Sequence, residues 1–599
     1  MREIKGKIKY IIIGYAMIAS LFHIYTGIFG TIHSMLQRSI HLMFLLPLAF
    51  LLYPAHKNAP KDKIPIYDIV LAILALLPGL YMLLNFDWVI SRTWGVTPLL
   101  PIEKIFGILF IILVIEATRR TVGITLAVLA TIFLTYPLVA SSLPGALRGG
   151  SATVEEILET MYLTTEGILS IPVGVSATYV ILFLIFAAFL EVSGIGDYFM
   201  KLVILMAGKR KGGPAKVAVI SSGIMGMLSG SAVANVYGTG SFTIPMMKKV
   251  GFPRDFAGAV EAVASSGGQI MPPIMGAGAF IMASLLGIPY LRVVKAAILP
   301  ALLYYLGVYV VVHFKSVKDN LGVLPDEAIP AKKEVIKKVY LLTPVIVLIY
   351  TLIFRTPQYA AVIGIFATIA VAFISKDTRL SLNDFIKALS DGAIKAIPVA
   401  AACASAGVVV GAINLTGVGF KIVAGIVDLS AGIGIIAAIF VAIIGVIMGM
   451  GLPTTAAYVV VAAIAVPALT RLGFLPLASH FFVFYYAILS NITYPVALAV
   501  YAAASISGGD PRRIGSHAVK LGIMGFIAPF LALYNPSLLF ESSSTMAIIS
   551  LLLAMLGTIF LGAGIVGYLK KELTKIERIV IGSLGALGII LAAGLGYLL

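Results

Sequence analysis

Long apolar runs separated by short polar loops make up most of the chain. Each of the first five runs approaches the roughly 20 residues that a helix needs to span a bilayer. These runs lie near residues 10–30, 39–54, 66–85, 104–118 and 121–142. Basic residues gather in alternate loops, at Lys57, Lys61, Lys63, Arg119 and Arg120. Because cytoplasmic loops carry an excess of Lys and Arg, the pattern predicts a small four-helix membrane unit over residues 1–120, with a cytoplasmic N-terminus.

The next segment, residues 121–170, has a different character. One apolar helix precedes the stretch GALRGGSATVEEILETMYLTTEG, which is rich in Gly, Ser and acidic residues. We expect a connecting helix and an extracytoplasmic linker that contains a short amphipathic helix; a plain loop is the alternative interpretation. The first apolar run has no small-residue cleavage site, so we also expect an uncleaved first helix.

From residue 171 to about 540, the apolar segments are interrupted repeatedly by Gly, Pro and small polar residues. Two stretches resemble each other at a constant shift of 222 positions, without a gap. The residues that coincide are breakers of regular helix: Gly223 with Gly445, Pro245 with Pro467, Gly251 with Gly473, Pro273 with Pro495, and Gly287 with Gly509. Since Gly and Pro set backbone geometry, this coincidence predicts an internal repeat.

The distribution of charge predicts that the two copies are inverted. Lys209, Arg210 and Lys211 precede the first broken segment, and Lys248 and Lys249 follow it, so this segment is expected to enter and leave on the cytoplasmic side. Five further crossings, near 256–288, 297–313, 339–354, 359–375 and 393–413, place the second segment on the opposite face, where only Arg471 flanks it. We therefore predict a large transport domain over 171–540 with re-entrant hairpins near 217–247 and 439–469, and a two-helix C-terminal extension over 541–599.

Composition agrees with a membrane protein and excludes several other classes. Hydrophobic residues make up 60% of the 599 positions, charged residues make up 12%, and the mean hydropathy is +1.06. A soluble enzyme, a nucleic-acid binder and a disordered chain are excluded, because none could carry so much apolar surface. The length allows about 15 spans. The net charge of +17 follows from basic cytoplasmic loops, and the single Cys403 excludes an intramolecular disulfide.

The broken segments are the candidates for the chemistry of the chain. Non-helical backbone survives at membrane depth only inside protein or beside a water-filled cavity. The hairpin tips LSGSAVAN and MGLPTTAA place Gly or Pro beside hydroxyl residues, and the later breaks SSGGQIMPP and LSNITYP place Gln269 or Asn491 just before prolines. Free carbonyls, hydroxyls and amides are neutral oxygen ligands that suit Na⁺. We therefore predict two Na⁺ sites, each between a hairpin tip and the broken helix of the same copy, with the substrate between the two tips.

Taken together, these features resemble a fused permease of the tripartite ATP-independent periplasmic (TRAP) transporters, in the TAXI-type branch. The residues that carry the resemblance are SGSAVANV, GMGLPTTAAYV, PRDFAGAVEAVASSGGQIMPPIMGAGAF and LSNITYP, and it covers nearly the whole chain. It implies an all-α polytopic protein of the inner membrane with an ion-transporter-like elevator fold, and a Na⁺-coupled symporter that imports small organic acids delivered by an extracytoplasmic solute-binding protein. It implies no cofactor other than Na⁺ as the coupling ion.

Carried over residue by residue, the resemblance assigns the following positions. The first Na⁺ site would use Ser229, Gly230, Ser231 and Asn235, with Gly268, Gln269 and Pro273 opposite. The second would use Gly451, Pro453, Thr454 and Thr455, with Asn491 and Thr493 opposite. Substrate contacts are expected at Ser231, Pro273, Thr454 and Pro495. The second tip has Pro453 where the first has Ser231, so the two sites need not use the same ligands.

Other functions remain as alternatives. A self-sufficient divalent-anion symporter or an ion antiporter of related fold would need no binding protein. An intramembrane enzyme would need converging acids, histidines or metal ligands at mid-membrane, and the sequence shows no such pattern. No phosphate-binding loop of the GxxxxGK[ST] type occurs, so ATP hydrolysis by that motif is excluded. Glu261 and Asp255 lie near Arg254 at a helix start, and we interpret them as a solvated cap or ion pair rather than a proton relay.

Overall fold

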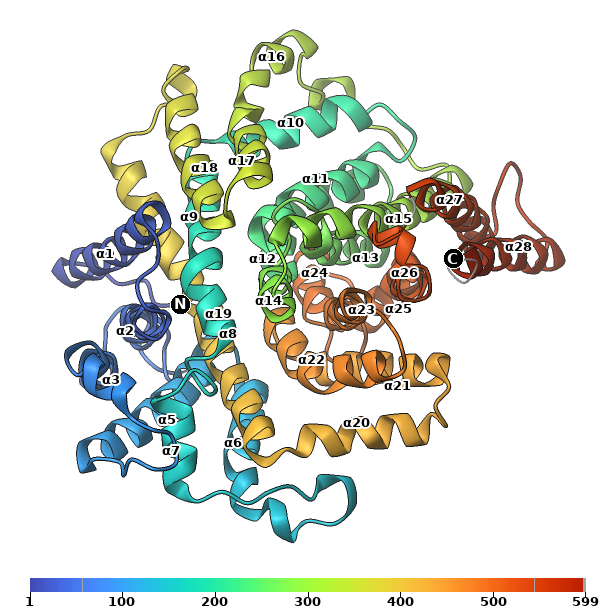
Figure 1. The fold of residues 1–599 in the computed structure, drawn as a ribbon. Helices are drawn as coiled ribbons and strands as arrows, with labels where there is room; N and C mark the ends of the chain where they lie inside the picture. Colours follow the sequence, from blue (N-terminus) through green and yellow to red (C-terminus); the bar gives the residue numbers. More distant parts are fainter. Residues whose placement is uncertain (57, 543, 596–599) are drawn as a thin grey trace. The chain divides into compact units, whose positions relative to one another are not determined.

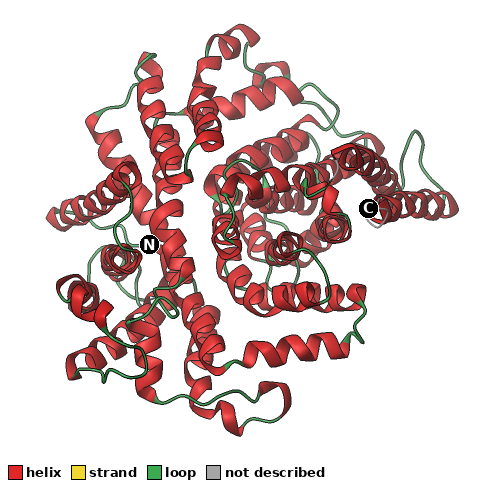
Figure 2. Ribbon diagram, viewed as in Figure 1, coloured by secondary structure: helices red, strands yellow, loops and turns green. Residues whose placement is uncertain are grey.

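The computed structural model describes residues 1–56, 58–542 and 544–595. In these residues the regular elements are helices joined by loops, apart from one isolated β-bridge between Tyr568 and Glu572 (Figure 2). Ten of the described helices are long and apolar enough to cross a membrane, and two bent helix pairs raise the number to as many as twelve. The prediction of an all-α polytopic membrane protein is thereby confirmed. The number of spans is lower than the length alone allows, because residues are also used in five shorter apolar helices.

Contacts divide the chain into two compact units that do not follow its order. Unit 1 contains Met1–Gly194, Leu342–Ala431 and Thr455–Ile464, and unit 2 contains Ile195–Leu341, Gly432–Thr454 and Ala465–Leu599. The main helices of unit 1 are α1 (Lys7–Phe29), α2 (Ser34–Leu52), α3 (Ile66–Leu84), α4 (Phe86–Ser91), α5 (Pro101–Thr121), α6 (Ile124–Val139), α7 (Val154–Tyr162), α8 (Ile171–Val175), α9 (Ile181–Val192), α17 (Thr343–Phe354), α18 (Pro357–Ala372), α19 (Leu382–Thr416) and α20 (Val418–Leu429). A π-helical turn, Ser176–Val180, joins α8 to α9.

Unit 1 is organised around α19, which is 35 residues and about 52 Å long (Figure 1). Helices α1, α2, α5, α6 and α9 all pack against it. Its middle is rich in Ala, Gly and Ser, so neighbouring helices approach closely and bond to its backbone. Thr118 Oγ1 of α5 donates to the Ala401 carbonyl at 3.0 Å, and Ser20 Oγ of α1 donates to the Leu389 carbonyl at 2.6 Å. The N-terminal helices are thus attached to a helix that follows them by more than 250 residues.

A buried ionic network holds the N-terminal helices together. The Asp68 carboxylate of α3 receives Arg2 Nη2 and Arg120 Nη1, both at 2.5 Å, and all three side chains are almost completely buried. Arg120 Nε also donates to Glu116 at 2.6 Å. Removing one partner of a buried pair leaves an uncompensated charge and costs about 3–5 kcal/mol, so this network strongly disfavours separation of the chain start, α3 and α5.

The prediction of a short helix in the linker is confirmed, and the Gly-rich stretch after α19 also contains a short helix. The linker contains the short helix α7, which begins with a capping box in which Thr153 and Glu156 bond each other's backbone N–H. The Gly-rich stretch near 417–436 forms α20, a helix of 12 residues that is about 18 Å long and too short to cross a bilayer core.

Unit 2 contains the first candidate region and, of the second, the residues up to Thr454 and the helix break at Asn491. Its helices are α10 (Ile195–Ala207), α11 (Gly213–Ser229), α12 (Ala232–Lys249), α13 (Arg254–Gly267), α14 (Ala277–Leu286), α15 (Tyr290–Lys318), α16 (Lys332–Lys337), α21 (Gly434–Gly449), α23 (Pro476–Leu489), α24 (Leu498–Ser507), α25 (Pro511–Leu521), α26 (Ile523–Tyr534), α27 (Ser544–Val566) and α28 (Lys575–Gly594). Helix α22 (Thr454–Arg471) is divided between the two units.

Helix boundaries support the internal repeat. At the shift of 222 positions, α12 and α22 begin and end at matching residues, and so do α13 and α23. The starts and ends of α10 and α20, α11 and α21, and α14 and α24 agree within two residues. The copies diverge after this point, because α15 is continuous whereas its counterpart is bent by 40° between α25 and α26. The inverted orientation of the copies stays a prediction.

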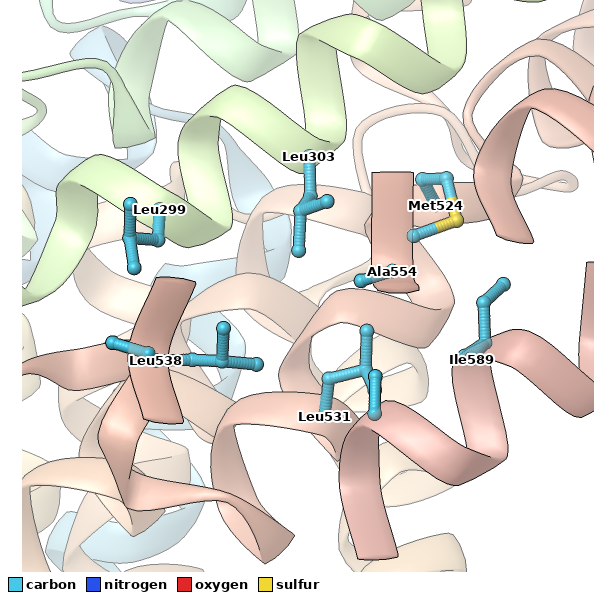
Figure 3. Close-up of a cluster of buried hydrophobic side chains, with 9 residues drawn as sticks. Leu299, Leu303, Met524, Leu531, Leu538, Ala554 and Ile589 are labelled. Atoms are coloured by element: carbon cyan, nitrogen blue, oxygen red, sulfur yellow. The ribbon is translucent and has the colours of Figure 1, made fainter. Parts of the chain in front are cut away.

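Within unit 2, the C-terminal helices α27 and α28 pack on α15 and α26 through an apolar cluster. Figure 3 shows Leu299 and Leu303 of α15 pointing toward Leu531 and Leu538, with Ile589 of α28 nearby. Between α27 and α28 the contact is backbone to backbone, because a Cβ on Gly585 would stand 2.4 Å from Leu561 N and 2.7 Å from Gly557 O. Gly585 is therefore required because no side chain fits between the two backbones, and not because its backbone adopts a conformation that only glycine tolerates.

This contact gives a stability prediction. Gly585→Ala is expected to destabilise the protein by about 1–3 kcal/mol, because the added methyl group meets backbone atoms that must move. The measurement is the thermal unfolding midpoint in detergent. Gly594→Ala on the same helix is the control, since a Cβ there meets nothing within 4 Å and its midpoint should be unchanged or higher. Equal midpoints for the two variants would contradict the prediction.

Candidate cation sites

The tip of the first hairpin is the turn between α11 and α12. Helix α11 ends at Ser229, Gly230 adopts a left-handed conformation with φ 63°, and Ser231 caps α12 by accepting the Ala234 N–H at 3.4 Å. A Cβ on Gly230 would lie 3.7 Å from Gly276 Cα and from the Met275 carbonyl oxygen, which is ordinary contact distance. The tip therefore lies against the chain that follows the break in the same copy.

One turn before the tip, the hairpin and the broken helix touch through their backbones. A Cβ on Gly268 would stand 2.5 Å from Gly226 Cα, and a Cβ on Gly226 would stand 2.8 Å from Asn235 Nδ2. Asn235 is buried and its Nδ2 donates to the Ser222 carbonyl at 2.8 Å, which joins the two arms of the hairpin. The structure thus brings Gly230, Asn235 and Gly268 into one neighbourhood; that they bind Na⁺ stays a prediction.

Gln269 occupies the break itself. Helix α13 ends at Gly267, a short 3₁₀ turn covers Gly268–Ile270, and regular helix resumes at Ala277. The Gln269 carbonyl accepts the Gly276 N–H at 2.7 Å, which closes the break. Its side chain is only 2% exposed, and its Nε2 has no hydrogen-bond partner among the described residues. Because an unpaired buried donor costs about 1–3 kcal/mol, this amide is a group that an oxygen-bearing ligand or a water molecule would stabilise.

The second copy repeats the arrangement with different side chains. Gly451 has φ 75°, Pro453 precedes α22, and Thr454 is its first residue. Asn491, which matches Gln269 at the repeat shift, donates from Nδ2 to Thr454 Oγ1 at 3.0 Å and to the Ile488 carbonyl at 3.1 Å. Its own carbonyl accepts the Ala499 N–H at 3.1 Å across the break. In both copies, therefore, an amide residue bonds across the break, and in the second copy it also reaches the hairpin tip.

The remaining predicted site residues do not take part in the contacts between a hairpin tip and a helix break. Thr493 Oγ1 donates to the Leu489 carbonyl at 2.8 Å, and Thr455 is buried in α22. The Pro273 carbonyl accepts the Tyr290 hydroxyl at 3.1 Å, and the Pro495 carbonyl accepts the Tyr501 hydroxyl at 3.0 Å. Ser231 and Pro495 are exposed, so their predicted substrate contacts remain predictions.

The interpretation of Glu261 as a solvated cap or ion pair is wrong. Its side chain is fully buried, and its carboxylate accepts from the hydroxyls of Ser222, Thr239, Thr243 and Ser265. The nearby Asp255 does behave as expected at a helix start, because it lies 4.0 Å from Arg513 and accepts the Asp510 N–H. A signal was present in the sequence: Thr239 and Thr243, like Glu261 and Ser265, are four residues apart and so share one helix face.

A family model described as "Tripartite ATP-independent periplasmic transporter, DctM component" matches residues 109–567. The chain belongs to this family. The match begins within α5 and covers α6 through α27 completely, whereas α1 to α4 lie outside it, which fits the fused arrangement that the resemblance implied. Family membership and the apolar helices identify the chain as a multi-pass protein of the inner membrane.

Individual relatives agree with the family. The permease is 26% identical over 242 residues to the C4-dicarboxylate TRAP transporter large permease protein DctM of Vibrio cholerae, covering 40% of this chain and 51% of the relative. It is 25% identical to the protein of the same name from Pseudomonas aeruginosa, over 33% of this chain and 47% of the relative. The chain thus spans about half the length of these relatives. It is also 22% identical over 446 residues to the isethionate TRAP transporter permease protein DctMQ of Oleidesulfovibrio alaskensis. This match covers 73% of this chain and 66% of the relative. These names indicate a transport protein rather than an enzyme.

The contact between Gly226 and Gly268 leads to a prediction for the permease. Gly268→Ala is expected to push the first hairpin away from the broken helix, because its methyl group would meet the Gly226 backbone at 2.5 Å. Amide hydrogen exchange within residues 222–235 should then be at least about tenfold faster, since 1.4 kcal/mol of lost packing corresponds to a tenfold change in opening.

The control is Gly238→Ala on α12, where a Cβ meets nothing within 4 Å. Its exchange in the same segment should match that of the unsubstituted permease. Equal protection in the Gly268→Ala variant would show that the close approach does not hold the hairpin in place.

Proposed function

We propose that the chain is the membrane permease of a Na⁺-coupled secondary symporter that imports a small organic acid. In this proposal an extracytoplasmic solute-binding protein delivers the acid, and the hairpins carry it across by an elevator-type movement. Family membership supports the dependence on a binding protein. The names of the relatives support the substrate class, because C4-dicarboxylates and isethionate are both organic acids.

The observation that carries Na⁺ coupling is the repeated pairing of a hairpin tip with an amide at a helix break. In the first copy the turn at Gly230 lies against Met275 and Gly276, and the Gly276 N–H bonds to the Gln269 carbonyl; in the second, Asn491 donates to Thr454 at 3.0 Å. Both offer carbonyl, hydroxyl and amide oxygens, which are hard, neutral ligands. No group of three or more His, Cys, Asp or Glu side chains that could hold a metal occurs among the described residues, so these neutral groups are the candidates for a monovalent cation.

The elevator movement requires a body that moves and a body that stays. The division of the chain into two compact units supports this requirement, since a large part of the internal packing lies within each unit. Unit 2 contains the first hairpin, both helix breaks and Thr454, so it is the candidate for the moving body.

Na⁺ binding is tested without knowledge of the substrate. The thermal unfolding midpoint of the purified permease is expected to be higher in NaCl than in KCl at equal ionic strength, because a ligand that binds only the folded state stabilises it. Thr454→Val removes the hydroxyl that faces Asn491 but keeps the shape of the side chain, and it should abolish most of the Na⁺-specific increase.

The matched control is Thr470→Val on the same helix, whose hydroxyl donates to the Val466 carbonyl at 3.2 Å. It should keep the full Na⁺ response. A Na⁺ response that is unchanged in Thr454→Val, or lost equally in both variants, would contradict the assignment of the second site.

Uptake into proteoliposomes tests the remaining parts of the function. The permease should import an organic acid only when a solute-binding protein that binds this acid is present and a Na⁺ gradient is directed inward. Uptake without the binding protein would favour the alternative of a self-sufficient symporter, and uptake that follows a K⁺ gradient equally well would reject Na⁺ coupling.

A further inference from the structure

A buried carboxylate on α13 faces both arms of the first hairpin, α11 and α12. Glu261 is 0% exposed, and Gly240 of α12 leaves the space for it, since a Cβ on Gly240 would stand 2.9 Å from Glu261 Cγ. Oε1 accepts from Ser222 of α11 at 2.6 Å, from Thr239 of α12 at 2.5 Å and from Ser265 of α13 at 3.0 Å. Oε2 accepts from Thr243 of α12.

No cation balances this carboxylate among the described residues. Besides Glu261, the titratable or charged side chains on α13 and on the helices packed around it are Arg254 and Asp255 on α13, Lys216 on α11, Tyr237, Lys248 and Lys249 on α12, Tyr290, Arg292, Lys295, Tyr304, Tyr305, Tyr309, His313, Lys315 and Lys318 on α15, His480, Tyr485 and Tyr486 on α23, Tyr501 on α24, and Arg512, Arg513, His517 and Lys520 on α25. None of these groups forms an ion pair or hydrogen bond with Glu261. Lys216 Nζ contacts His313, Lys248 Nζ donates to the Ser507 carbonyl, and the Tyr305 hydroxyl donates to the Ala264 carbonyl.

The surrounding hydroxyls can satisfy the carboxyl group in both of its protonation states. When Glu261 is ionised, all four hydroxyls donate to it, and hydrogen bonds of this kind stabilise a buried carboxylate. When a proton is added, two of the hydroxyls have other acceptors to turn to. Thr239 Oγ1 lies 2.9 Å from the Asn235 carbonyl, and Thr243 Oγ1 lies 3.1 Å from the Thr239 carbonyl.

The geometry also indicates which oxygen takes the proton. Oε1 has three hydroxyl donors and Oε2 has one, so the proton belongs on Oε2. The carboxyl O–H then donates to Thr243 Oγ1, and the Thr243 hydroxyl rotates to its backbone acceptor. Ser222 and Ser265 continue to donate to Oε1, so no buried polar group loses its partner and no heavy atom has to move.

We propose that Glu261 is a proton-binding site of the permease. The proton is taken up at Oε2 and released from it by rotation of the neighbouring hydroxyls. Because Thr243 lies on α12 and Glu261 lies on α13, binding of the proton reverses the hydrogen bond that joins this arm of the first hairpin to α13, while the bonds from Ser222 and Ser265 stay in place. The hydroxyl network therefore makes the packing of this hairpin sensitive to protonation.

The proposal is tested by infrared difference spectroscopy of the purified full chain in K⁺ buffer, without Na⁺ or substrate. Its outcome therefore does not depend on the proposed Na⁺ coupling. As the pH is raised from acidic to alkaline, the C=O band of a protonated carboxyl group should disappear. The component of this band that comes from Glu261 should be missing in Glu261→Gln and retained in Glu327→Gln, which changes an exposed carboxylate.

A pair of serine variants keeps the test decisive if Glu261→Gln does not fold. The Ser265 hydroxyl donates to Glu261, so Ser265→Ala removes a bond that favours the ionised form, and the titration midpoint should move to higher pH by about 1 unit. The adjacent Ser266 is equally buried but donates to the Ala262 carbonyl at 2.8 Å, so Ser266→Ala should leave the midpoint unchanged. A carboxyl band that does not change with pH, or identical midpoints in the two serine variants, would overturn the proposal.

Discussion

The constraint on which this structure depends is that backbone N–H and C=O groups in a bilayer must be satisfied by protein. An interrupted helix exposes such groups, so it persists only where neighbouring chain replaces the lost bonds. In this permease the replacement is local and repeated: the carbonyl of Gln269 accepts the Gly276 N–H in one copy, and the carbonyl of Asn491 accepts the Ala499 N–H in the other. Hairpin tips lie against both breaks. The polar groups that keep the interruptions stable are therefore the same groups that are candidates for binding a cation.

Close packing around these breaks requires small residues. Gly226 and Gly268 allow the hairpin to touch the broken helix, and Gly240 allows the hairpin to enclose Glu261. Elsewhere in the chain the same device joins α27 to α28 at Gly585, and a run of small residues lets five helices approach α19. Glycines thus allow close contact between neighbouring segments at these positions, while others, among them Gly230 and Gly451 at the hairpin turns, adopt positive φ.

The sequence contained enough information to locate the hairpins and the breaks. Gly and Pro act locally, so their coincidence at a shift of 222 positions predicted helix ends that agree within two residues in the paired elements. It did not reveal the environment of Glu261, because Ser222, Thr239 and Ser265 come together only when three helices pack. The length of α19 was also underestimated: its polar first turns, from Leu382 to Lys395, look like a loop until their contacts with other helices are known.

The account rests on the two hairpins entering the membrane from opposite faces. This is tested by placing single cysteines at Lys249 and Arg471, which are exposed and mark the matching ends of α12 and α22. The background is Cys403→Ser, which removes the buried native thiol. With a membrane-impermeant thiol reagent on intact cells, the cysteine at 471 should react and the cysteine at 249 should react only in inside-out vesicles. Reaction of both from the same side would contradict the inverted repeat and the paired cation sites built on it.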